Sequence, residues 1–261
     1  MASERRYLAG FGGYLWGELL PWLGWRGLLR ILMWTGLVNL VLYLDVVTDW
    51  DIGWVTLESL DEAVDLVWLF AALGAIVVTV GPVVAERRRG TAGWVVSKPV
   101  SRGTYVVGKV VAHSLGVAVS MVFIPGLVVY QWLPGTEHAR GFAPPTPHLG
   151  RYLIALGVIA LLTTFLVALV VMLGTLLKRR GPVTGISFFL LIFIFAPVVG
   201  YSWSKFTPGM LIDWQRPTGL TPLADYVFGG PLGPIEAVWA TALATVAFTG
   251  IAVAAFRRAD L

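Results

Sequence analysis

Six long apolar segments constrain the fold of this chain more than any other feature. A membrane-spanning helix needs about 20 apolar residues, because the hydrocarbon layer is roughly 30 Å thick and each helical residue rises 1.5 Å. Segments near residues 29–47, 64–85, 104–130, 151–177, 182–202 and 236–256 meet this requirement. Only 13% of the 261 residues are charged, half the share of a typical soluble domain. We therefore predict an all-α membrane protein with six transmembrane helices, forming a single transmembrane domain over residues 1–261.

The distribution of basic residues predicts the orientation. Lys and Arg collect on the cytoplasmic side because they resist translocation. With the N-terminus inside, all but four of the 19 basic residues fall in inner segments, the exceptions being Arg140, Arg151, Lys205 and Arg216. We predict a multi-pass protein of the plasma (inner) membrane with cytoplasmic N- and C-termini. The pI of 9.5 then reflects topological anchors beside a lipid bilayer, and we expect no nucleic-acid partner.

Residues 1–28 precede the first span, and we predict that they form an interfacial segment at the membrane surface. Over residues 14–30, Glu18, Arg26 and Arg30 fall within one arc of a helix, and tryptophans suited to the headgroup layer recur at positions 16, 22 and 25. Pro21 would kink or break a helix here. The two interpretations are an amphipathic elbow lying on the inner leaflet and the frayed start of the first span.

Small residues form a stripe on the third span, at Gly108, Ala112, Gly116 and Ser120. Their spacing of four places them on one helix face, where they allow a second helix to approach closely. Structural packing explains such a stripe better than a substrate-lining surface does. Polar residues at membrane depth, here Asn39 and His113, are functional candidates by default, but each also suits an ordinary hydrogen bond.

The longest outer segment, residues 203–235, is too apolar to extend into water. It contains five prolines together with large apolar residues such as Phe206, Leu211 and Phe228. We predict short helices or re-entrant turns that cap the domain.

Nothing in the sequence indicates catalysis. Residues Gly103 to Val110 approach the phosphate-binding pattern Gly-x4-Gly-Lys-Ser/Thr, but Val110 stands where the magnesium-binding hydroxyl is required. The three histidines lack metal-ligand spacing, and there is no cysteine. We expect no catalytic residue, no metal site and no cofactor bound by this chain.

The inner segment 86–109 carries the strongest functional signal. Gly90 suits the end of the second span, Thr91 can cap a short helix from Ala92 to about Ser97, and Pro99 limits that helix. An apolar Trp94-Val95-Val96 centre in a cytosolic loop would be costly without a surface to cover it. Glu86 is unusual because the helix dipole disfavours an acid at a helix C-terminus, so we expect Arg89, Arg102 or a partner's cation to compensate. A basic loop that serves topology alone is the simpler alternative.

This segment resembles the inner loop of ABC-2 type transporter permeases, the membrane subunits of ATP-binding-cassette exporters. The resemblance rests on Glu86-x3-Gly90-Thr91, on Ser97-x-Pro99-Val100-Ser101-Arg102, and on Tyr105 to Lys109. The order of spans and loops supports it over nearly the whole chain. Val95-Val96 stands where members often have Leu-Leu, which is a mild departure.

The resemblance implies that the loop is a coupling helix that docks into a groove of a separate ABC ATPase subunit. The implied docking residues are Glu86, Gly90, Thr91, Trp94, Val95, Ser97, Pro99, Ser101 and Arg102. ATP and Mg are expected on that ATPase, which would be present in two copies. A second permease subunit would complete a homo- or heterodimer. A lipid, a hydrophobic drug and a peptide would each fit an apolar pathway equally well.

Two functions remain open within this family. The chain is either the transmembrane subunit of an exporter, or a mechanical coupler that transmits ATP-driven motion to an extracytoplasmic partner. An ion-coupled secondary transporter would require buried acids at mid-membrane depth, and the carboxylates instead fall at span ends or in loops.

Overall fold

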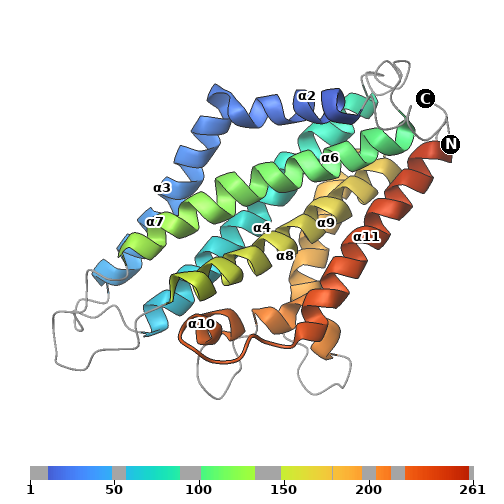
Figure 1. The fold of residues 1–261 in the computed structure, drawn as a ribbon. Helices are drawn as coiled ribbons and strands as arrows, with labels where there is room; N and C mark the ends of the chain where they lie inside the picture. Colours follow the sequence, from blue (N-terminus) through green and yellow to red (C-terminus); the bar gives the residue numbers. More distant parts are fainter. Residues whose placement is uncertain are drawn as a thin grey trace, which may run out of the picture.

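A computed structural model describes residues 11–48, 57–88, 101–132, 148–177, 179–195, 204–212 and 221–258. Every regular element in these ranges is a helix. The long ones are α3 (Trp25–Thr48), α4 (Leu57–Arg88), α6 (Arg102–Val117) with its continuation α7 (Ile124–Trp132), α8 (Leu149–Leu176), α9 (Arg180–Phe195) and α11 (Ile235–Arg258). They run side by side in one bundle, with α2 (Phe11–Leu23) lying across one end and α10 (Pro222–Val227) at the other (Figure 1).

Helix α8 forms the centre of the bundle. Its sequence is apolar on every side, which is typical of a helix surrounded by other helices, and it contacts α4, α6, α9 and α11. Helices α3 and α11 are also apolar but lie at the periphery, so that Leu32, Leu243 and Val246 are more than half exposed. An apolar surface of this kind is suited to lipid.

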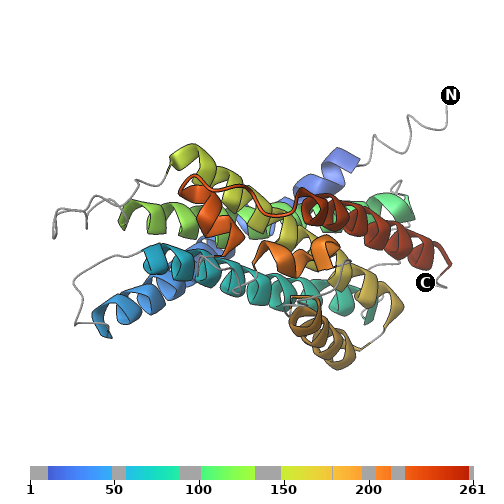
Figure 2. The same ribbon diagram turned by 90° about the horizontal axis from the view of Figure 1, so that it is seen from below.

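Five helices of the described part are long and apolar enough to cross a membrane, namely those in residues Trp25–Leu44, Asp61–Glu86, Arg102–Gln131, Leu149–Leu176 and Ile235–Arg258. They match five of the predicted spans. The span predicted over residues 182–202 corresponds to α9, whose 16 described residues fall short of the required length. Helix α9 lies at the edge of the bundle (Figure 2), and the rest of that predicted span lies outside the described residues.

A π-helical turn, η1 (Ala118–Phe123), joins α6 to α7 within one of these spans. The Ile124 N–H donates to the Val119 carbonyl five residues earlier. Pro125 explains the wider turn, because its ring lacks an N–H and clashes with the carbonyl four residues before it. An uninterrupted span was predicted here from the sequence, although Pro125 was a signal for an irregular turn.

Short helices occupy the described part of the outer segment, as predicted. They are η3 (Ser204–Phe206), η4 (Pro208–Leu211) and α10, and their residues Leu211, Leu223 and Val227 are fully buried. The N-terminal elbow is also present, since α2 ends at Leu23 and α3 begins at Trp25 in a new direction (Figure 1). Pro21 lies inside α2, so the chain bends at Gly24 and not at the proline.

Candidate functional site

A cluster of buried charges lies where α2, α4 and α6 meet. Lys109 of α6 is the centre, with only 1% of its side chain exposed. Its Nζ lies 2.9 Å from both carboxylate oxygens of Glu18 on α2 and 2.7 Å from Oε1 of Glu86 at the end of α4. A buried ammonium is stable only when it is paired, and two carboxylates satisfy it here. The Lys109 cluster thus ties together three helices that are far apart in the sequence.

Two tyrosines complete the cluster. The Tyr105 hydroxyl donates to Glu86 Oε2 at 2.6 Å, and the Tyr14 hydroxyl donates to Glu18 Oε1 at 2.8 Å. Burial, followed by the nearby Glu18 carboxylate, raises the pKa of Tyr14, so its hydroxyl stays protonated and remains a donor. On its other side Tyr105 stacks on Phe256 of α11, with ring centroids 4.9 Å apart. The cluster therefore extends to a fourth helix.

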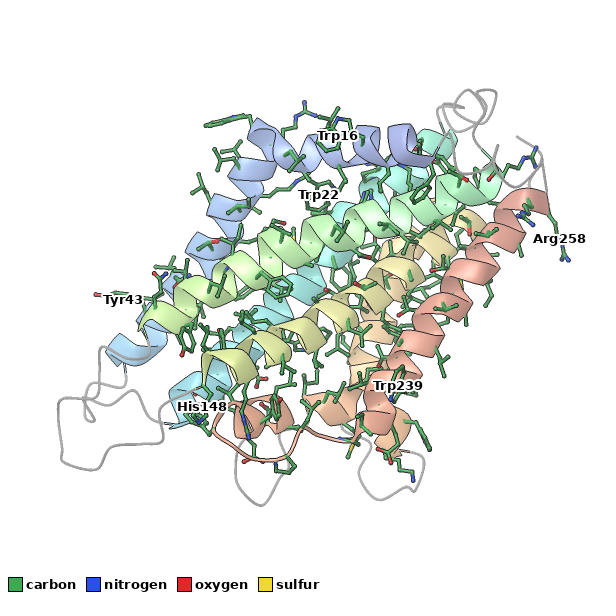
Figure 3. All side chains as sticks on the ribbon, viewed as in Figure 1. Trp16, Trp22, Tyr43, His148, Trp239 and Arg258 are labelled. Carbon is green, nitrogen blue, oxygen red and sulfur yellow. The ribbon has the colours of Figure 1, made fainter. Side chains whose placement is uncertain are left out.

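The small-residue stripe of α6 is the surface on which α2 packs. A Cβ added to Gly108 would lie 2.7 Å from the Tyr14 ring, and one added to Gly116 would lie 2.1 Å from Trp22 Cδ2. Trp22 extends from α2 toward α6 (Figure 3) and is 8% exposed. Tyr14, Glu18 and Trp22 are spaced by four, so one face of α2 meets the stripe. The prediction of structural packing at the stripe is confirmed.

At the opposite end, side chains hold the α10 segment to the bundle. Asp61 Oδ1 of α4 accepts hydrogen bonds from the Thr221 N–H at 2.8 Å and from the Thr221 hydroxyl at 2.6 Å. Arg151 of α8 donates to the carbonyls of Tyr226 and Gly230. The segment that ends at Gly230 is therefore attached to two long helices and is not a free loop.

Comparison with known proteins identifies the family. The profile described as ABC-2 family transporter protein matches residues 35–261. The chain belongs to the ABC-2 transporter family. A comparison with curated proteins gave no match. Together with its helices, this membership makes the chain a multi-pass membrane component of a transporter.

Three of the docking residues predicted for this ABC-2 protein lie within the described structure. Glu86 belongs to the Lys109 cluster, and Ser101 caps α6 by accepting a hydrogen bond from the Thr104 N–H. Arg102 donates to the Arg257 carbonyl near the end of α11 at 2.8 Å. The other six, Gly90, Thr91, Trp94, Val95, Ser97 and Pro99, lie outside the described residues.

Sequence reasoning missed Lys109 as a partner of Glu86. It expected Arg89, Arg102 or a partner's cation to compensate for Glu86. The intervals of four between Tyr14, Glu18 and Trp22 match those of the α6 stripe, so they could have indicated the contact of α2 with α6, but they carry no information about Glu86. His113 and Asn39 have ordinary local partners, since His113 Nδ1 donates to the Lys109 carbonyl and Asn39 Nδ2 to the Thr35 carbonyl.

The space beside the Lys109 cluster is small. A cavity of about 10 Å³ adjoins it, lined by Val83, Lys109 and Phe256 among others, and this volume is about that of one water molecule. Within the described residues no three His, Asp or Glu side chains are placed to hold a metal ion.

Proposed function

We propose that this ABC-2 protein is the transmembrane subunit of an ATP-driven exporter. A separate ABC ATPase, in two copies, would bind ATP and Mg and hydrolyse the ATP. The segment around Gly90 to Ser101 would be the coupling helix that docks on it. The family match supports this proposal, and the Lys109 cluster is the observation that carries it, because a docked segment can do work only if its ends are fixed to the bundle.

Described residues on both sides of that segment are attached to the bundle. Residue Glu86 before it is held by Lys109 and Tyr105, and Arg102 after it is held by the end of α11. A displacement of the docked segment would therefore move α2, α4, α6 and α11 together. ATP would drive the change through its higher affinity for the closed ATPase dimer, which shifts the equilibrium between inward and outward access.

The proposal includes the topology and the assembly. The chain would cross the plasma (inner) membrane six times, with α9 and the residues after it forming the fifth span and both termini in the cytoplasm. A second permease subunit, identical or related, would enclose the pathway.

The decisive experiment is to purify the tagged chain from its own membranes in a mild detergent and to identify the proteins that accompany it. We expect an ABC ATPase, lost on Trp94→Ala. Trp239→Ala is the matched control, because Trp239 is 65% exposed near the start of α11, at the end of the bundle away from α2 (Figure 3). Trp94→Ala should insert normally but abolish ATP-dependent transport. Unchanged ATPase binding and transport in Trp94→Ala would contradict the docking assignment.

A second candidate function is mechanical coupling to an extracytoplasmic partner without export of a solute. The attachment of the α10 segment through Asp61 and Arg151 favours it, because motion of α4 and α8 would reach that surface directly. A soluble partner that co-purifies, and that is lost on Asp61→Ala but retained on Trp94→Ala, would support this function over export.

A further inference from the structure

At the elbow between α2 and α3, an arginine lies over a tryptophan ring that is closely packed by its neighbours. The Arg30 guanidinium lies over the Trp22 ring, with Cζ 4.6 Å from the ring centroid. Trp22 is itself fixed, because it packs against Gly116 and meets the His113 ring edge-on at 5.9 Å. Gly27 also approaches the Trp22 backbone so closely that an added Cβ would lie 1.6 Å from its carbonyl oxygen. These contacts of Trp22 therefore fix the position of Arg30.

Arg30 is not neutralised by the described part of the chain. The two ion pairs found there join Lys109 to Glu18 and to Glu86, and no carboxylate pairs with Arg30 or Arg26. Glu18, the acid of α2, is already engaged by Lys109 and Tyr14. Arg26 lies one helical turn before Arg30, and like charges at this spacing repel each other. Arg30 is held in place over Trp22 and Arg26 is exposed one turn away, so an anion bound to both guanidiniums would relieve their repulsion.

The surroundings indicate which anion it is. Arg30 is five residues into α3, about 8 Å along the axis from Trp25, so its charge must reach back toward the membrane surface. The side chains around the elbow are large, apolar and exposed, and they are Trp16, Leu20, Leu23, Trp25, Leu28 and Leu29. A small soluble anion would leave these apolar side chains uncovered. A phospholipid does, because its acyl chains cover the apolar residues while its phosphate lies at the level of the arginines.

We propose that the α2–α3 elbow is a binding site for one anionic phospholipid, whose phosphate is held by Arg26 and Arg30 over the Trp22 ring. The guanidinium forks match phosphate oxygens. Bound lipid would remove the repulsion between the two arginines. It would also hold α2 in the position in which Glu18 reaches Lys109.

Native mass spectrometry of the purified chain tests this proposal, with phosphatidylglycerol and phosphatidylcholine of identical acyl chains as probes. We expect the wild type to prefer phosphatidylglycerol. Arg26→Gln and Arg30→Gln should each weaken its binding about fivefold, the value for about 1 kcal/mol per basic residue, and leave phosphatidylcholine unchanged. Arg30→Lys should fall in between, because lysine keeps the charge but loses the planar fork.

Arg258→Gln is the matched control, since it removes an exposed arginine at the C-terminal end of α11, on the opposite side of the bundle from the elbow (Figure 3), and should not alter the preference. An equal loss in Arg258→Gln would overturn the proposal in favour of unspecific charge attraction. An unchanged preference in Arg26→Gln, a substitution at an exposed position, would also overturn it. Inorganic phosphate should not displace the lipid, and displacement at equal concentration would identify a site for free anions.

Discussion

At the scale of single residues, Lys109 is the side chain on which the arrangement of the α2 end depends most. We expect Lys109→Met to lower stability by about 2 kcal/mol, because it leaves two carboxylates facing each other without a cation. The value is below the roughly 3–5 kcal/mol typical of fully buried pairs, since Glu18 and Glu86 are 19% and 29% exposed. Thermal unfolding in a mild detergent, followed by tryptophan fluorescence, measures the change.

Removal of the two carboxylates as well supplies the control. The triple variant Glu18→Gln, Glu86→Gln, Lys109→Met contains no unpaired charge at this site, so it should regain most of the stability lost by Lys109→Met. A triple variant less stable than Lys109→Met alone would show that charge pairing is not what holds the cluster together.

At the scale of helices, the contact between α2 and α6 predicts that replacing a glycine by alanine lowers stability at Gly116, which faces α2, but not at Gly157, which faces open space. Gly116→Ala should destabilise by about 1–3 kcal/mol, because the new methyl group meets the fixed Trp22 ring. Gly157→Ala on α8 should be neutral or stabilising, since no atom lies within 4 Å of its added Cβ and alanine favours a helix. Unfolding midpoints of the two variants test this, and equal shifts would refute the close approach of α2.

The attachment of α10 gives a second prediction for an element. Asp61→Ala removes the acceptor for both the Thr221 N–H and its hydroxyl, and a hydrogen bond to a charged group contributes about 1.5–3 kcal/mol. Amide hydrogen exchange over residues 221–228 should therefore accelerate at least tenfold in Asp61→Ala. Asp61→Asn retains an acceptor oxygen and should change it less. Equal exchange in wild type and Asp61→Ala would mean that other contacts hold the segment.

These elements also show how far sequence reasoning reaches. Length and hydropathy suffice to place the five spanning helices of the described part, because a bilayer allows few alternatives to them. The stripe from Gly108 to Ser120 predicted a close helix contact but not its partner, because a small residue carries no information about what fills the space beside it. The pairing of Glu86 with Lys109 depends on how the end of α4 lies against α6, and no local pattern encodes that relation.

At the scale of the whole molecule, the charge distribution predicts an orientation that two sites on α11 test directly. Glu236 and Arg258 are both exposed and lie at opposite ends of this 24-residue helix, which is about 36 Å long and crosses the bundle from the α10 end to the α2 end. The natural chain contains no cysteine, so a single introduced thiol is labelled without background. In intact cells, a membrane-impermeant thiol reagent should label Glu236→Cys and should label Arg258→Cys only after the membrane is opened. The reverse pattern would mean that the basic residues of the α2 end lie outside the cell. The Lys109 cluster would then face away from any cytoplasmic ATPase, and the proposed coupling would fail together with the orientation.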